Sequence, residues 1–225
     1  SAKDIATLSS ARLFVMHGAG LDPWAEKIAP SLREKGITTI IMQERIQFDI
    51  QNENDKTPDP HTWLDPLFLA KEVDALRDAL IENDSANAED YRANTARLQQ
   101  QLTTLHESFA VGLAECAQRD VIVSHNAFSY LGRQYNITFH SITGITPEAE
   151  ASAQRLRTLI DFAREKNISM ILTEPLASDT LAQTLATEVG AKTAILHPLE
   201  GLTLAEQQRG ENYFTIMQKN LAVLR

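Results

Sequence analysis

The stretch Val121-Ile122-Val123-Ser124-His125-Asn126-Ala127-Phe128 decides the fold class, because an apolar run gives way directly to polar residues and then to a helical pattern. A short β-branched run of this kind predicts a buried strand over Val121–Ser124, and the residues after it predict a helix over Asn126–Tyr135. The same strand-then-helix rhythm recurs along the chain. We therefore expect an α/β fold in which mostly parallel sheets are covered by helices.

Other apolar runs and helical spacings extend this pattern over the whole sequence. The further expected strands are 13–16, 38–42, 137–140, 170–173 and 193–196. The further expected helices are 23–35, 66–82, 88–117, 147–166, 178–189 and 210–224. Between the strand expected over 38–42 and the helix expected over 66–82, the polar and acidic segment 49–58 is expected to be an exposed loop.

The helix expected from Ala88 to about Ala117 is the longest in the chain. Thirty helical residues span about 45 Å, which exceeds the width of one small domain. We therefore expect an amino-terminal lobe over 1–86, a long linker helix over 87–117 and a carboxyl-terminal lobe over 118–225. A long edge helix of a single domain is the alternative.

Composition excludes several classes of protein. The net charge of −9 and the pI near 5.2 argue against a nucleic-acid surface, which needs a basic stripe. No apolar run approaches the roughly 20 residues that span a bilayer. Cys116 is the only cysteine, so neither an internal disulfide nor a cysteine-based metal cage is possible, and we expect a buried, inert thiol in the last turn of the long helix.

Five of the six histidines are candidates for a shared site: His17, His125, His140 and His197, which come just after an apolar run, and His61, which lies in a Pro-rich motif. The carboxyl ends of parallel strands meet at one edge of a sheet, where open α/β sheets usually bind their ligands. Imidazole nitrogens suit a transition metal, zinc first. One such histidine is more often structural, but five together make metal binding the leading hypothesis. Because neutral imidazole is the ligand, affinity is expected to fall below about pH 6.5.

The octapeptide Asp59-Pro60-His61-Thr62-Trp63-Leu64-Asp65-Pro66 is the sharpest of these motifs. Asp59 is expected to accept a hydrogen bond from the second ring nitrogen of His61, and Trp63 is expected to keep water away. Asp65 and Pro66 also have the pattern of a helix start, which explains them without involving His61.

Other side chains are candidates for a supporting role or for ligation. His125 stands between a strand and a helix, and His140 is a candidate for a group that supports a ligand. Glu174 is a carboxylate at a comparable strand end, and Glu200 is another oxygen donor near the candidate loops. His17 precedes Gly18-Ala19-Gly20, which resembles a turn that needs small residues.

In sequence order, these motifs resemble those of the zinc- and manganese-specific solute-binding receptors of ABC transporters, the ZnuA/TroA type. The resemblance covers essentially the whole chain. It is carried by Gly18-Ala19-Gly20-Leu21-Asp22-Pro23-Trp24, the octapeptide, Ser124-His125-Asn126-Ala127-Phe128-Ser129-Tyr130, Ile142-Thr143-Gly144-Ile145-Thr146-Pro147-Glu148-Ala149-Glu150, Thr173-Glu174-Pro175 and Gly210-Glu211-Asn212-Tyr213.

The resemblance implies a two-lobed receptor with the metal held by His61 from the first lobe and His125 from the second. His197 stands where the family commonly has an Asp ligand, and we expect it to ligate the metal in place of that carboxylate; the alternative is that it points away and leaves the position to water. The resemblance also implies that the first histidine ligand and the first strand of the amino-terminal lobe lie upstream of Ser1.

For the whole protein, the resemblance implies a monomeric receptor, not an enzyme, that passes Zn(II) to a membrane permease. Its expected location is periplasmic, or lipid-anchored on the outer face of the cytoplasmic membrane. Mn(II) is the alternative metal, although it prefers more oxygen donors. From another class, a zinc hydrolase would need an open coordination position and a general base, a role open to Glu174.

Overall fold

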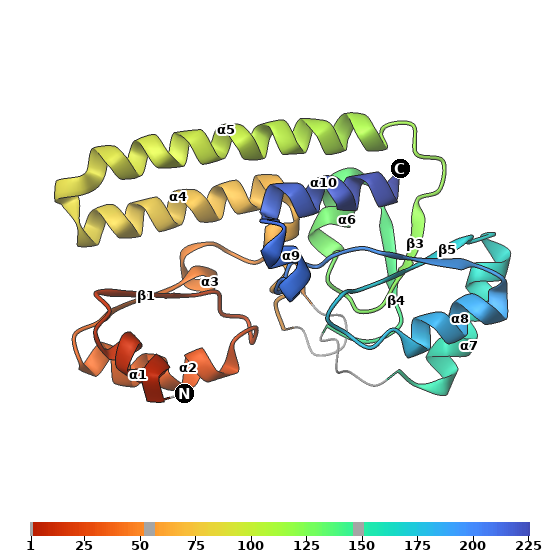
Figure 1. Cartoon of the computed structure of the whole chain (residues 1–225), viewed down its shortest axis with the longest axis horizontal. Helices are drawn as coiled ribbons and strands as arrows, with labels where there is room; N and C mark the ends of the chain where they lie inside the picture. The colour runs from red at the N-terminus through yellow and green to blue at the C-terminus, as the bar shows by residue number, and fades with distance from the viewer. Residues whose placement is uncertain (1, 52–56, 146–150) are drawn as a thin grey trace. The chain divides into compact units, whose positions relative to one another are not determined.

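A computed structural model describes residues 2–51, 57–145 and 151–225 of the protein. The chain divides into two compact units (Figure 1). Unit 1 consists of Ser1–Thr62 and Pro66–Thr103, and unit 2 of Trp63–Asp65 and Thr104–Arg225. Part of the expected loop 49–58, and the start of the helix expected over 147–166, lie outside the described residues.

Unit 1 is built on two parallel strands, β1 and β2, paired from Leu13↔Thr38 to Met16↔Ile41. Its core places Met16 against Ala25 and Ala29 of the helix α2. The elements of this part of the chain are α1 (Ala2–Ser9), β1 (Leu13–Met16), α2 (Pro23–Glu34), β2 (Thr38–Ile41), α3 (Met42–Arg45), η1 (Thr62–Leu64), α4 (Pro66–Asn83), η2 (Ser85–Asn87) and α5 (Ala88–Leu113). The long helix α5 passes from unit 1 into unit 2 after Thr103.

Unit 2 contains a parallel four-stranded sheet in the order β4-β3-β5-β6. Its further elements are β3 (Asp120–Val123), α6 (Ser129–Tyr135), β4 (Thr138–Ser141), α7 (Ala153–Glu165), β5 (Met170–Thr173), α8 (Thr180–Val189), β6 (Lys192–Ile195), α9 (Leu204–Gln208) and α10 (Tyr213–Leu224). The parallel strands and covering helices confirm the α/β prediction.

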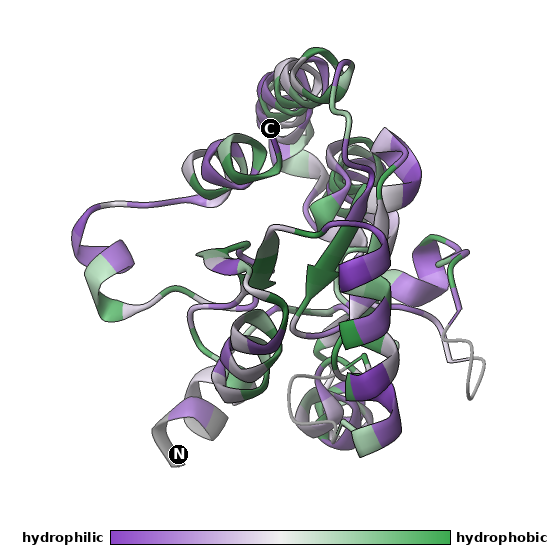
Figure 2. Cartoon of the chain, turned by 90° about the vertical axis from the view of Figure 1, so that its right-hand side faces the viewer, coloured by the Kyte–Doolittle hydropathy of each residue, from purple (hydrophilic) through white to green (hydrophobic). Residues whose placement is uncertain are grey.

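Helices cover both faces of this sheet, so its central strands are apolar on both sides. Successive side chains of a strand point to opposite faces. Accordingly, Val123 packs with residues of α5, α6 and α10, whereas its neighbour Ile122 packs with residues of α7 and α8. Figure 2 shows hydrophobic strands between helices of mixed polarity.

The connections of the sheet create a switch point between β3 and β5. After β3 the chain passes through α6 to β4, on one side of the sheet order, whereas after β5 it passes through α8 to β6, on the other side. Loops that diverge in this way leave a crevice at the carboxyl ends of the two strands, which is where open α/β sheets bind ligands.

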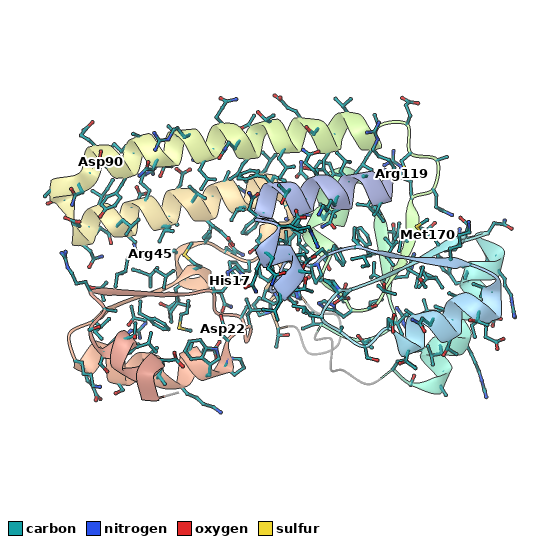
Figure 3. The ribbon with its side chains drawn as sticks, viewed as in Figure 1. His17, Asp22, Arg45, Asp90, Arg119 and Met170 are labelled. Carbon is teal, nitrogen blue, oxygen red and sulfur yellow. The ribbon has the colours of Figure 1, made fainter. Side chains whose placement is uncertain are left out.

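Two expectations about the long helix are wrong. The helix ends at Leu113 rather than near Ala117. The guanidinium of Arg119, labelled in Figure 3, donates to the carbonyl oxygens of Leu113 at 2.8 Å and Ala114 at 3.0 Å, and so satisfies the exposed carbonyls of the last turn. Cys116 is therefore outside the helix and only half-buried.

The sequence pattern also missed three short helices. The helix α1 precedes the first strand, α3 begins at Met42 where the second strand was expected to end, and α9 lies in the last loop. Among the described residues, no helix combines the length and the apolar character needed to cross a membrane.

Replacing Gly132 of α6 with Ala should destabilise the protein by about 1–3 kcal/mol through overpacking. A Cβ at this position would lie 2.5 Å from the backbone oxygen of Ile137, which cannot move aside as a side chain can. The measurement is urea denaturation. Gly112→Ala is the matched control, because its Cβ would meet only side-chain atoms within 4 Å, the nearest being the tip of Leu221 at 3.0 Å. Equal stability of the two variants would contradict this account.

Candidate metal centre

His61 of unit 1 is almost fully buried and is held by Asp59. The Oδ1 atom of Asp59 accepts the backbone N–H of His61 at 2.9 Å and lies 2.7 Å from its Nδ1. Since an ionised carboxylate only accepts hydrogen bonds, Nδ1 carries the proton of the neutral ring and the lone pair is on Nε2. Metal-binding histidines are usually oriented in this way. The Asp59 contact expected from the sequence is present.

His17, labelled in Figure 3, belongs to a partly buried polar network that supports this motif from within unit 1. Its Nε2 lies 2.6 Å from the carbonyl oxygen of Pro60 and 3.1 Å from the hydroxyl of Thr62. That hydroxyl also donates to Glu72 of α4. Desolvation by burial raises the pKa of Glu72 to about 7, although the hydrogen bond from Thr62 opposes the shift. His17 therefore fixes the backbone of the motif.

Trp63 belongs to unit 2, where it holds the loop that follows β6. Its indole N–H donates to the carbonyl oxygen of Pro198 at 2.8 Å. Its own carbonyl oxygen accepts the hydroxyl of Tyr213 at 2.8 Å. The indole expected to keep water from the metal thus has a defined structural partner.

His125 lies at the switch point of the unit 2 sheet and is completely buried. Glu174, which follows β5, accepts both the backbone N–H of His125 at 3.1 Å and its Nδ1–H at 2.6 Å. The other ring nitrogen, Nε2, lies 3.2 Å from Oε1 of Glu200. Two ligands of one tetrahedral zinc ion are about 3.3 Å apart when each bond is about 2 Å long. His125 and Glu200 are therefore spaced as two zinc ligands.

The two carboxylates control the charge of this histidine. Desolvation by itself lowers the pKa of His125, but the hydrogen bonds and charges of Glu174 and Glu200 outweigh it and raise the pKa to about 9. A proton therefore stays on the ring at neutral pH. The sequence had treated Glu200 only as a nearby oxygen donor, because its pairing with a histidine 75 residues away depends on the sheet order.

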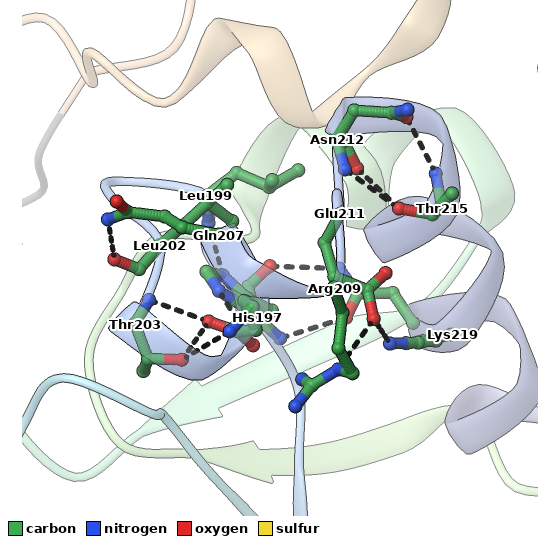
Figure 4. Close-up of polar contacts among 12 residues, drawn as sticks. His197, Leu199, Leu202, Thr203, Gln207, Arg209, Glu211, Asn212, Thr215 and Lys219 are labelled. Atoms are coloured by element: carbon green, nitrogen blue, oxygen red, sulfur yellow. Dashed lines mark hydrogen bonds and ion pairs between the residues drawn. The ribbon is translucent and has the colours of Figure 1, made fainter.

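His197, which follows β6, is buried with the opposite ring arrangement (Figure 4). Its Nδ1 accepts the backbone N–H of Leu199 at 2.9 Å. The proton of the neutral ring must then be on Nε2, which is buried without a hydrogen-bond partner among the described residues and lies 3.6 Å from Glu206. Desolvation lowers the pKa of His197, which favours this neutral form. Neither nitrogen offers a lone pair to a metal, which argues against the expected ligation.

His140 differs from the expectation for a group that supports a ligand. It lies in β4, in line with the strand expected over 137–140, but its contacts are not with a candidate ligand. Its Nε2 is 2.8 Å from Asp120, at the opposite end of β3 from His125, and its ring packs on Phe162 with the centroids 4.2 Å apart. The structure therefore brings together His125, Glu174 and Glu200, and gives His140 other partners.

A cavity of about 410 Å³ opens beside these carboxylates in unit 2. It is formed by the loops after β5 and β6, at the carboxyl edge of the sheet. Its lining consists of Glu174, Pro175, Leu176, Ala177, Ser178, His197, Pro198, Glu200 and Gly201. The site is thus open to a ligand from the edge where the sheet topology predicts one.

Comparison with known proteins agrees with these features. Residues 1–225 match the model of the family described as ZnuA, zinc-uptake complex component A, periplasmic. The zinc-binding lipoprotein AdcA of Streptococcus pneumoniae is 34% identical over 237 residues, which cover 100% of this chain and 47% of AdcA. The high-affinity zinc uptake system protein ZnuA of Bacillus subtilis is 33% identical over 235 residues, covering 99% of this chain and 74% of the relative.

The fold is also similar to solved structures. The Zn(II)-bound ZnuA-like domain of Streptococcus pneumoniae AdcA matches with a TM-score of 0.82 and 35% identity, covering 100% of this chain and 82% of that domain. The chain spans about half the length of the streptococcal AdcA proteins that it matches.

Glu72 should make the metal-free protein less stable as the pH rises. Its folded-state pKa of about 7 is above its ordinary value of 4.5, so its contribution to stability is complete below about pH 4.5 and is lost as the pH rises through 7. The loss should be at most about 3 kcal/mol. The substitution Glu72→Gln should remove this loss of stability at high pH. Urea denaturation in chelator at pH 5 and pH 8 measures the effect, with the exposed Glu34→Gln as control. An unchanged pH dependence in Glu72→Gln would refute the assignment.

Proposed function

This chain belongs to the ZnuA family of zinc-uptake components, and on this premise we propose that it is a receptor that binds Zn(II) outside the cytoplasm and delivers it to the permease of an ABC transporter. The observation that carries the proposal is the buried His125, held by Glu174 and spaced from Glu200 as a second zinc ligand. The names of the relatives support zinc as the cargo. Purification without chelator followed by metal analysis tests the cargo directly.

The proposed ligands are His61, His125 and Glu200. Both histidines have Nδ1 beside a carboxylate, so each neutral ring has its lone pair on Nε2. Zinc usually takes four donor atoms. Unit 1 contributes only His61 to the proposed ligands, and unit 2 contributes His125 and Glu200. We therefore propose that the ligands of both units bind one ion. Asp59 and Glu174 orient the rings. We do not include His197, because its Nδ1 accepts a backbone N–H.

The donor set favours zinc over manganese. Two imidazoles and one carboxylate suit Zn(II), whereas Mn(II) prefers sites made mainly of oxygen donors. Competition between the two metals for the purified protein distinguishes these cargoes. An equal affinity for Mn(II) would contradict the preference.

Binding and release, rather than catalysis, fit the role of Glu174. A zinc hydrolase needs a general base beside the metal-bound water. Glu174 is the base that the sequence suggested, but its hydrogen bonds within the described part of the chain are both with His125, at 2.6 Å and 3.1 Å. It acts on the ligand ring, and a receptor that is not an enzyme needs no other chemistry.

Removing a ligand should weaken zinc binding far more than removing an orienting carboxylate. We expect His61→Ala, His125→Ala and Glu200→Gln to lose at least about a hundredfold in affinity, and Glu174→Gln to lose about ten- to a hundredfold. Competition with a chelator of known affinity measures the loss. The control is His106→Ala, which removes an imidazole that is hydrogen-bonded to the Tyr135 hydroxyl and is not a proposed ligand. Wild-type affinity in both His61→Ala and His125→Ala would refute the shared site.

Zinc binding at pH 7 should release about one proton. The pKa of about 9 keeps His125 protonated without metal, and zinc must displace that proton from Nε2. The affinity should therefore fall about tenfold for each pH unit below about 9. Calorimetry in two buffers with different ionisation enthalpies counts the protons. Binding at pH 7 without proton release would contradict the assignment of a protonated His125 as a ligand.

A further inference from the structure

The loop between β6 and α9 contains a backbone conformation that its sequence does not favour. Leu199 has a φ of 61°, in the left-handed region, which residues with a Cβ rarely adopt. Glycine adopts this conformation readily, but here a partly buried leucine does so, and it packs against the apolar core. Another interaction must therefore hold the backbone in place.

His197 supplies that interaction. Its Nδ1 accepts the N–H of Leu199, two residues later in the chain, as Figure 4 shows. An Asn or Asp side chain closes a turn in the same way, with its δ oxygen accepting the N–H two residues on. The backbone of His197 is itself fixed by the buried Asn220, which accepts its N–H at 2.8 Å and donates to its carbonyl oxygen at 2.8 Å.

The turn ends at a proposed metal ligand. Glu200 follows Leu199 directly, and its carboxylate lies 3.2 Å from Nε2 of His125. We propose that His197 is a positioning residue: it holds Leu199 in the left-handed conformation and so presents Glu200 to the metal. This inference rests on the proposed function, because it assumes that Glu200 is a ligand.

The far side of the His197 ring has a different neighbour. Nε2 lies 3.6 Å from Glu206, whose Oε2 accepts the N–H of Thr203 at 2.8 Å and its hydroxyl at 2.7 Å, at the start of α9. The two ring nitrogens therefore face different parts of the loop. Because only Nδ1 touches Leu199, the two nitrogens can be tested separately.

The matched variants are His197→Asn and His197→Ala. Asn has an acceptor at the δ position and nothing at the ε position, so it can close the turn but cannot replace Nε2. We expect His197→Asn to bind zinc within about threefold of the wild type and His197→Ala to bind about tenfold more weakly. Chelator competition measures affinity, and thermal denaturation checks that both variants fold.

A second substitution tests the mechanism. Because glycine adopts a positive φ at little cost, Leu199→Gly should restore most of the affinity that His197→Ala loses. X-ray absorption of the zinc-loaded His197→Asn protein should show as many imidazole ligands as the wild type. Equal losses in the Asn and Ala variants, the absence of rescue by Leu199→Gly, or one imidazole fewer in His197→Asn would each overturn the inference.

Glu200→Gln separates this inference from the proposed function. If that variant binds zinc normally, Glu200 is not a ligand and the proposed ligand set fails. If Glu200→Gln loses zinc but His197→Ala binds like the wild type, only the positioning role of His197 fails.

Discussion

The hydrogen bond between Glu174 and His125 is the constraint on which the proposed metal centre depends in unit 2. One carboxylate oxygen accepts both the backbone N–H and the ring N–H of the same histidine, so it fixes the loop and the ring together. A buried carboxylate is costly unless it is paired and hydrogen-bonded, and this contact supplies both requirements. It joins the loops after β3 and β5 across the switch point, beyond the last backbone pair of these strands, Val123↔Leu172.

Ring orientation separates the histidines of this protein into two groups. In His61 and His125 a carboxylate lies beside Nδ1, which puts the lone pair of the neutral ring on Nε2. In His197 a backbone N–H points at Nδ1, which puts the proton on Nε2. All three are buried, and His197 follows an apolar run as His125 does, so neither burial nor position along the chain distinguishes them. The partner of Nδ1 distinguishes the three rings, because it decides whether Nε2 has a lone pair for a metal.

The sequence predicted the features that depend on local patterns. The strands β1 and β5 have their expected bounds, and the contact of His61 with Asp59 was expected because only two residues separate them. The pairing of His125 with Glu174 was not expected. The two residues are 49 positions apart in the sequence and meet only because β3 lies beside β5 in the sheet. The left-handed Leu199 was also beyond prediction, because leucine does not signal a positive φ. The sequence therefore favoured His197 as a ligand over Glu200.

The charges of unit 2 suggest how the site exists without metal. Glu174 and Glu200 both approach His125, and two carboxylates beside a neutral ring would carry an uncompensated negative charge. With a pKa of about 9, the ring keeps a proton that offsets part of this charge at neutral pH. In the proposed site, zinc would replace this proton by a cation at the same nitrogen. Because a positive charge is present in both states, the carboxylates need not separate when the metal leaves. On the proposed function, unit 2 would therefore keep the geometry of its proposed ligands when the metal leaves.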